Sequence, residues 1–519
     1  MPGHLIIAGR RLLSGSLLRL CNLVVAAISS FFLMPFIVHH LGDRMYGFWT
    51  LATAFIGYYG LLDFGLSTAV SQYMSIAIGK KDHNECRVVF NTALRIQSFI
   101  GCLALVATLL IIGVTPWFTK THEDAVLFRK VIAVLGTSIA LTFPARAYSG
   151  LLDAELRFDI QSLLSILFVV LRTSLTVVAI LGGYGLLALA WIQLIATMVG
   201  TLLQIFFAKR QVSWAEIHGG SIDPKMAKAF FSYSVFIFLA AIADILRFQV
   251  DALVIASLIG LAAVTHYRVA TVLARYYTDI IICITGMIQP VLSRLHSAED
   301  RKALEKVFFF ATKVSLCSSL FIAAGLIGWG RPFIARWMGA NYEDAFWPLV
   351  ALSVSVLLDV GQNPSVSLLY ATFKHRVYTY MNGSEGLINL GLSLLLAKPL
   401  GILGVALGTV LAAFLIRVVV QPYVVCKVSG LHYGNYVKNS GNILVRSIGV
   451  LAVALALIIW GLRPNYFLMI SSAISATIIY AIGSWRIVFD SSERIQLLSL
   501  INRKQNSRAD LMSREAIVP

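Results

Sequence analysis

Residues 46–81 read YGFWTLATAFIGYYGLLDFGLSTAVSQYMSIAIGKK, and Asp63 is the one charged residue before the closing lysines. As a straight helix this stretch would be about 50 Å long, whereas the hydrocarbon core of a bilayer is about 30 Å thick. We therefore expect the span to tilt or bend, with Gly57, Gly60 and Gly65 as candidate positions for a bend. A carboxylate inside a span marks a functional site by default, although Asp63 capping a helix break is an equal alternative.

The whole chain has the composition of a membrane protein. Of 519 residues, 58% are hydrophobic and 13% are charged, with a mean hydropathy of +0.81, whereas soluble domains are nearer half apolar and a quarter charged. Apolar runs recur from end to end, so we expect an all-α polytopic membrane protein of about fourteen transmembrane helices. These cover residues 17–38, 46–66, 88–113, 131–152, 160–182, 184–207, 229–258, 264–290, 307–329, 346–371, 376–397, 400–426, 441–461 and 466–488.

The distribution of lysine and arginine predicts the orientation. With the N-terminus inside, the inner connections and the tail carry 25 of these residues and the outer connections carry 8. Because positive residues stay on the cytoplasmic side, we expect both termini to be cytoplasmic. The net charge of +17 lies mostly in these short loops, so it does not indicate nucleic-acid binding. The first apolar run is too long for a signal peptide and lacks a cleavage site, so it is the first span.

An internal repeat predicts the architecture. At an offset of 218 residues, Gly42 matches Gly260, Gly183 matches Gly401 and Lys209 matches Lys427, and at 217 Ala154 matches Ala371. Six spans is an even number, so the two halves share one topology, which is a parallel repeat with a cavity expected between the halves. The predicted parts are an N-terminal six-helix lobe (1–208), a cytoplasmic linker (209–228), a C-terminal six-helix lobe (229–427), an additional helix pair (441–488) and a disordered cytoplasmic tail (489–519).

Several short motifs resemble one known family. They are Leu62-Asp63-Phe64-Gly65-Leu66-Ser67 in span two, Phe143-Pro144 in span four, Gln249-Val250-Asp251 in span seven, Pro290-Val291-Leu292-Ser293 closing span eight and Gly401-Ile402-Leu403-Gly404 opening span twelve. With the span count, they resemble the polysaccharide transporters, which include the O-antigen (Wzx-type) lipid-linked oligosaccharide flippases. These belong to the superfamily of the multidrug (MATE) exporters and lipid II flippases. The resemblance implies two six-helix lobes, often followed by two additional C-terminal helices.

Charged residues inside the spans are the candidate site. Span seven carries Asp244, Arg247 and Asp251 on one face, and span eight carries Arg268, Arg275 and Asp279 within a narrow arc. Such stripes face the protein interior or a water-filled cavity. The arginines of both stripes are ligand candidates, but Arg247 and Arg275 could instead form ion pairs with acids three or four residues away on their own helices. The candidate substrate-binding cations are Arg146, Arg172, Arg247, Arg268 and Arg275.

The resemblance implies a substrate for these cations, a polyprenyl-diphosphate-linked oligosaccharide moved across the cell (inner) membrane by alternating access. Guanidinium groups suit a diphosphate because their planar fork donates two hydrogen bonds to phosphate oxygens. Asp63, Asp359 and Glu385 are mid-span carboxylates, and each is a candidate for coupling transport to protons or sodium ions. The expected partners are this lipid-linked substrate, membrane lipids, a coupling ion and other polysaccharide-assembly proteins.

The two alternative functions are a small-solute exporter and a membrane enzyme. A drug or small-solute exporter of the same fold would favour an acidic or apolar cavity over one with several arginines. A membrane glycosyltransferase or polymerase needs a sizeable outer loop or an acidic catalytic cluster. The outer connections near 114–130 and 330–345 are short, and no nucleophile–base arrangement or phosphate-binding glycine loop is present. We therefore expect no enzyme activity, no cofactor and no metal, and the six cysteines show no paired spacing.

Overall fold

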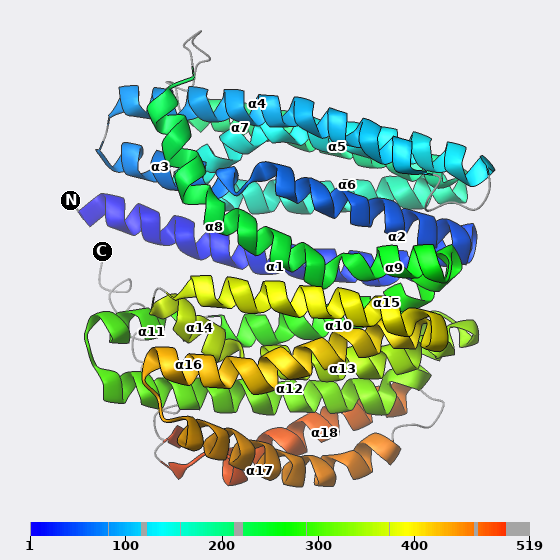
Figure 1. The fold of residues 1–519 in the computed structure, drawn as a ribbon, viewed down its shortest axis with the longest axis vertical. Coiled ribbons are helices and arrows are strands. Elements are labelled where there is room, and N and C mark those ends of the chain that lie inside the picture. The colour runs from blue at the N-terminus through cyan, green and yellow to red at the C-terminus, as the bar shows by residue number, and fades with distance from the viewer. Residues whose placement is uncertain are drawn as a thin grey trace, which may run out of the picture. The chain divides into compact units, whose positions relative to one another are not determined.

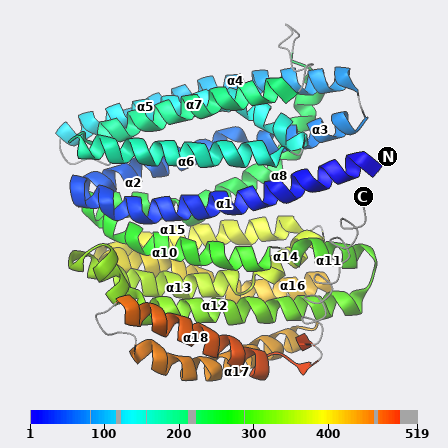
Figure 2. The same ribbon diagram turned by 180° about the vertical axis from the view of Figure 1, so that it is seen from behind.

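The structure is a computed structural model that describes residues 2–494 apart from 81, 116–121, 156, 212–221, 287, 373, 461–465 and 492. The described part contains helices and no β-strand, which confirms the predicted all-α class (Figure 1 and Figure 2). Nine helical segments of this part are long and apolar enough to cross a membrane. The number fourteen stays a prediction, because several of the predicted spans are broken into shorter helices.

The chain forms two compact units. The first comprises Met1–Arg268 and Asn382–Gly408, and the second comprises Val269–Met381 and Thr409–Pro519. The predicted lobes at 1–208 and 229–427 stay a prediction, and much of the predicted linker lies outside the described residues. The first unit contains α1 (Pro2–Leu41), α2 (Asp43–Tyr58), α3 (Leu66–Lys80), α4 (His83–Val114), α5 (His122–Ala154), α6 (Phe158–Leu181), α7 (Leu186–Gln211), α8 (Pro224–Phe248) and α9 (Val250–Leu258).

Two helices contribute to both units, and the remaining helices belong to the second. The shared helices are α10 (Leu261–Thr285) and α15 (His375–Ala413). The second unit also contains α11 (Ile288–Ser297), α12 (Arg301–Trp337), α13 (Phe346–Val360), α14 (Asn363–Ala371), the π-helical turn η4 (Phe414–Val420), α16 (Gln421–Ser429), α17 (Tyr433–Trp460) and α18 (Tyr466–Ile487), with a 3₁₀ helix η3 (Ala340–Ala345) before α13.

Close helix packing organises the first unit. Helix α5 packs along both α4 and α7, and α1 packs along α6 (Figure 1). Gly101 of α4 faces the carbonyl oxygen of Ala140, and Gly136 of α5 faces the side chain of Thr108. Small residues let the backbones of membrane helices approach closely, so these contacts set the α4–α5 spacing. Arg146 belongs to α5, and Asp63 lies in a short helical segment that contacts α4.

Span two is bent, as its length predicts. Helix α2 ends at Tyr58, a 3₁₀ helix (η1) runs from Tyr59 to Asp63, and α3 begins at Leu66. Phe64 and Gly65 between them have left-handed backbones, with φ of 49° and 75°. Of the three predicted bend positions, Gly60 and Gly65 therefore lie in the break, while Gly57 remains inside α2.

The internal repeat is visible in the backbone. Gly42 and Gly260 have φ of 80° and 142°, and Gly183 and Gly401 have φ of 76° and 60°. Positive φ is a conformation that glycine adopts without the steric cost of a side chain, so matched glycines mark matched turns. The Ala154–Ala371 pair agrees, because these residues end α5 and α14. The two chain halves thus repeat their turns, and the sharp turn near predicted spans eleven and twelve lies at Gly401 inside α15.

In the second unit, α12 packs along α13 and α17, and α17 packs along α18 (Figure 2). Buried hydroxyls join these helices: Tyr480 donates to the carbonyl oxygen of Cys317 at 3.0 Å. Lys313 of α12 donates to Glu493 at 2.8 Å and to Asp490 at 3.2 Å. These two acids lie at the start of the predicted tail, whose residues beyond 494 lie outside the described part.

Candidate functional site

Asp63 lies at the break in span two and serves as the cap of α3. Its carboxylate accepts hydrogen bonds from the hydroxyl of Ser67 at 2.7 Å and from the backbone N–H of Ser67 at 3.2 Å. A side-chain oxygen at this position satisfies a donor that a helix N-terminus leaves unpaired. The capping alternative for Asp63 is therefore present in the structure.

The same carboxylate forms a cross-helix ion pair. Nη1 of Arg146, on α5, lies 2.9 Å from Oδ1 of Asp63, and Nε2 of Gln97, on α4, donates to the same oxygen at 3.1 Å. The Arg146 guanidinium also lies 4.4 Å from the ring centroid of Phe143. The Arg146 side chain is 31% exposed, so a ligand has access to a guanidinium that Asp63 now holds.

Glu385 is paired with Arg247 in a ladder between α8–α9 and α15. Arg247 Nε lies 2.9 Å from Glu385 Oε1, and the two side chains are 6% and 2% exposed. One turn away on each side, Asn382 donates to Asp244 at 3.4 Å and Asn389 donates to Asp251 at 3.3 Å.

Each rung of this ladder joins residues 138 positions apart, so α15 runs parallel to α8 and α9 in one register. The rungs recur with spacings of three and four residues, as in a parallel coiled-coil seam. The charged stripe predicted for span seven therefore faces α15, with Arg247 and Asp251 buried and Asp244 exposed. Arg247 has its partner on another helix as well as candidate partners on its own.

Close packing at Gly386 keeps the two helices of the ladder near each other. A Cβ atom on Gly386 would lie 2.8 Å from Cβ of Leu246 and 3.2 Å from the backbone nitrogen of Arg247. Such distances are below ordinary van der Waals contact, so glycine at this position lets α15 approach α8.

Gly386→Leu should therefore separate the two helices and lower the yield of folded protein. We expect the free energy of unfolding to fall by several kcal/mol. Overpacking contributes about 1–3 kcal/mol of this loss, and the weakened ion pair contributes the rest. Gly391→Leu is the matched control, because a Cβ on Gly391 meets no atom within 4 Å. Size-exclusion profiles and thermal midpoints of the two variants measure the difference. Equal behaviour of both variants would show that the close approach at Gly386 is not required.

The third candidate carboxylate, Asp359, is paired within the second unit. Its Oδ1 lies 3.2 Å from Nε of Arg417, whose side chain is 0% exposed. Arg417 lies in the π-helical turn η4, donates to Gln421 at 2.7 Å, and accepts a hydrogen bond on its carbonyl from Gln362 at 2.6 Å. All three mid-span carboxylates, Asp63, Asp359 and Glu385, therefore hold an arginine from another helix.

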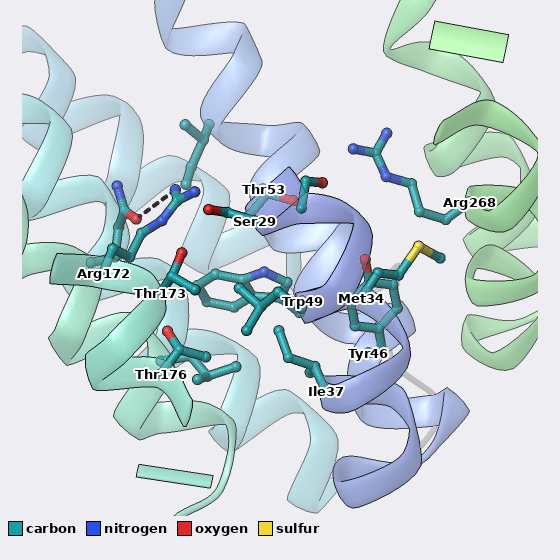
Figure 3. A pocket seen from close by; sticks show the side chains of 15 residues that line it. Ser29, Met34, Ile37, Tyr46, Trp49, Thr53, Arg172, Thr173, Thr176 and Arg268 are labelled. Carbon is teal, nitrogen blue, oxygen red and sulfur yellow. Dashed lines mark hydrogen bonds between the residues drawn. The ribbon is translucent and has the colours of Figure 1, made fainter. Parts of the chain in front are cut away.

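A cavity of about 330 Å³ opens among helices of the first unit (Figure 3). Arg172 from α6 and Arg268 from α10 line it, and their side chains lie on opposite sides in Figure 3. Within the described part of the chain, no acidic residue lines it. Hydroxyl, aromatic and amide side chains make up much of the remaining wall. These side chains include Trp49 and Thr53 from α2, Thr173 and Thr176 from α6, and Gln193 from α7.

Arg172 is the most distinctive group in this cavity. Its Nη1 donates to Oε1 of Gln193 at 3.3 Å, and Gln193 in turn donates to Thr197 at 3.4 Å. These partners are neutral, unlike the carboxylates that hold Arg146, Arg247 and Arg417. Next to it, the Thr173 hydroxyl oxygen is buried and has no hydrogen-bond partner among the residues that the structure describes. A half-buried cation and an unsatisfied hydroxyl that line one cavity both suit an anionic, oxygen-rich ligand.

The five predicted cations therefore occupy different environments. Arg172 and Arg268 share the cavity, Arg146 pairs with Asp63, and Arg247 is buried in the ladder. Arg275 forms the in-helix pair that was the alternative, with Nε 3.1 Å from Asp279 and a side chain 69% exposed. Trp49, Thr173 and Gln193 were not predicted, although Gln193 is an amide inside an apolar span and could have been singled out.

Sequence comparison assigns much of the chain to one family model. Residues 41–347 match the model described as polysaccharide biosynthesis protein. Among individual relatives, the uncharacterized membrane protein EpsK of Bacillus subtilis is 20% identical over 498 residues, which cover 93% of this chain and 97% of EpsK. A Shigella flexneri protein whose name describes it as an O-antigen transporter is 21% identical, with 74% of this chain and 92% of that protein covered.

Solved structures share the fold. The lipid II flippase MurJ in an inward closed conformation matches with a TM-score of 0.70 and 15% identity, covering 91% of this chain and 97% of MurJ. An inward-facing multidrug resistance MATE family transporter of the MOP superfamily matches with a TM-score of 0.68 and 16% identity, covering 80% of this chain and 98% of the transporter. The predicted MATE-like fold is therefore confirmed.

Proposed function

The chain belongs to the polysaccharide biosynthesis protein family, and from this membership we propose that it is a flippase for a polyprenyl-diphosphate-linked oligosaccharide. The chain is a multi-pass membrane transporter of MATE-like fold rather than an enzyme. The substrate would move from the cytoplasmic to the outer leaflet of the cell membrane by alternating access. The names of two related proteins, an O-antigen transporter and a lipid II flippase, support this substrate class.

The cavity with Arg172 is the observation that carries the proposal. Arg172 is half-buried beside a neutral amide, and no carboxylate within the described residues compensates its charge. A diphosphate supplies that compensation, and a guanidinium binds it through two parallel hydrogen bonds. Arg268 on the other side of the cavity would bind the same anionic head group, while Trp49 and Thr173 offer a stacking surface and a hydroxyl to the adjoining sugar.

The Arg146–Asp63 pair supplies a coupling step. A diphosphate that reaches the exposed part of Arg146 competes with Asp63 for the same guanidinium. Once released, Asp63 would be a carboxylate without its counter-ion, and a proton or sodium ion would be favoured there. Substrate binding and ion binding would thus be linked through one arginine.

The other two pairs have a different role in this proposal. The side chains of Arg247 and Arg417 are 6% and 0% exposed, so substrate has no direct access to them. Their burial favours a structural role for Arg247, Arg417 and their carboxylates Glu385 and Asp359. We place the substrate contacts at Arg146, Arg172 and Arg268 instead.

Asp63→Asn should reduce ion-driven translocation at least tenfold without lowering the amount of folded protein. Asparagine keeps an oxygen that accepts from Ser67, so the cap of α3 survives, but it can neither pair with Arg146 nor take up a cation. The measurement is translocation into vesicles with and without an imposed proton or sodium gradient. Asp82→Asn is the control, because Asp82 also caps a helix, α4, through the backbone N–H groups of Asn84 and Glu85. Wild-type translocation by Asp63→Asn would remove Asp63 from the coupling step.

A direct test of the substrate uses purified protein in vesicles. The protein should move an oligosaccharide carried on a polyprenyl diphosphate and should not move the same oligosaccharide on an uncharged lipid. Movement of neither lipid, in protein shown to be folded, would exclude the proposed substrate class.

A further inference from the structure

A second cavity, of about 390 Å³, lies in the second unit and is separate from the proposed transport site. Three chain segments form it: the α11–α12 connection, the α14–α15 connection and the end of α16. All three belong to connections that the distribution of lysine and arginine places on the cytoplasmic side. Connections on the same side of the membrane can line one cavity, and these three do.

The rim of this cavity is cationic. His296, Arg301 and Lys374 line it, and none of these side chains forms an ion pair with any residue in the described ranges. Arg301 donates through Nη2 to the carbonyl oxygen of Gly430 at 2.6 Å, which fixes the guanidinium at the rim. One acid, Glu299, also lines the cavity. Arg301 and Lys374 outweigh it, so the rim has a net positive charge even with His296 neutral.

The floor of the cavity is apolar. Leu304 and Leu368 are 7% and 0% exposed, and Leu295 and Val428 complete the apolar lining. A cationic rim above an apolar floor matches an amphiphilic anion, with a phosphate at the rim and a hydrocarbon part below. The ends of membrane helices on the cytoplasmic side lie where anionic phospholipid head groups are found, and basic pockets there bind them.

We propose that this cavity binds the phosphate of an anionic phospholipid of the inner leaflet. Lys374 and Arg301 bind the phosphate, and the leucines contact the glycerol and upper acyl carbons. A soluble phosphate compound presents the same chemistry to the rim but has no part that would fill the apolar floor. The apolar floor therefore favours the lipid.

The test uses the purified full-length chain in detergent and short-chain phosphatidylglycerol as the probe, with binding followed by the shift in thermal midpoint. Wild type should bind phosphatidylglycerol at least fivefold more tightly than short-chain phosphatidylcholine, and Lys374→Gln should lose about fivefold in affinity, the effect of about one cationic side chain near an anionic lipid surface. Lys374 is exposed and makes no side-chain hydrogen bond in the described part of the chain, so its replacement should not disturb folding.

Lys302→Gln is the matched control, because Lys302 is an exposed cation next to Arg301 that does not line the cavity. An unchanged affinity in Lys374→Gln, or an equal loss in Lys302→Gln, would overturn the site. Inorganic phosphate is the second probe. If it competes with phosphatidylglycerol at similar concentrations, the site belongs to a soluble phosphate compound and the lipid assignment is wrong.

Discussion

Replacing Glu385 with alanine is expected to destabilise the protein by about 3–5 kcal/mol, the cost of removing one partner of a buried ion pair. The change leaves the Arg247 guanidinium, whose side chain is 6% exposed, without the carboxylate 2.9 Å away. Folded yield by size-exclusion chromatography and the thermal midpoint are the measurements. We expect most of the Glu385→Ala protein to aggregate at temperatures that wild type survives.

Two further variants make this expectation specific. Asp279→Ala removes the acid of an exposed i, i+4 pair, since its partner Arg275 is 69% exposed, and should cost at most about 0.5 kcal/mol. The double variant Arg247→Met with Glu385→Leu removes both buried charges and should recover much of the lost stability. Wild-type stability of Glu385→Ala, or no recovery in the double variant, would contradict the structural role of this pair.

Arg172→Gln is expected to have the opposite combination of effects. Because the hydrogen-bond partner of Arg172 is the neutral Gln193, removing this cation leaves no buried carboxylate unpaired. Stability should stay the same or rise, since a half-buried cation inside a membrane span is itself costly. Translocation should fall about 10- to 100-fold, the equivalent of losing charge-assisted hydrogen bonds of about 1.5–3 kcal/mol to the substrate.

Arg172→Lys separates charge from geometry. Lysine keeps the positive charge but donates from a single point instead of a planar fork, so it should restore translocation only in part. Arg129→Gln, at an exposed position of α5, is the control for general loss of positive charge. An Arg172→Gln protein that is unstable, with Arg172→Lys fully stable, would indicate that Arg172 supports the fold instead of the substrate.

Periodicity and repeats were readable from the sequence because they are local or regular. The length of residues 46–81 required a bend, and the bend lies at Gly60–Gly65. The offset of 218 residues identified glycines that share positive φ, such as Gly183 and Gly401. The spacing of the stripe in span seven put its residues on one face of the helix, and two of them, Arg247 and Asp251, are buried.

Contacts between helices could not be predicted from the sequence. The spacing of Asp244 and Arg247 suggested an in-helix pair, yet Arg247 also pairs with Glu385, which lies 138 residues further along the chain. A single sequence shows which face of a helix is charged but not which helix it meets. For the same reason Arg146 had no visible partner, although Asp63 is 2.9 Å away, and the neutral surroundings of Arg172 were equally hidden.

The most direct test of the central claim is the translocation of a fluorescent oligosaccharide lipid by purified protein in vesicles, measured side by side for two carriers and two proteins. The carriers are a polyprenyl diphosphate and an uncharged lipid bearing the same glycan, and the proteins are wild type and the double variant Arg172→Gln with Arg268→Gln. We predict that wild type moves the diphosphate-linked glycan alone and that the folded double variant moves neither. Equal movement of both carriers by wild type, or wild-type rates in the double variant, would contradict a flippase that recognises a diphosphate through cavity arginines.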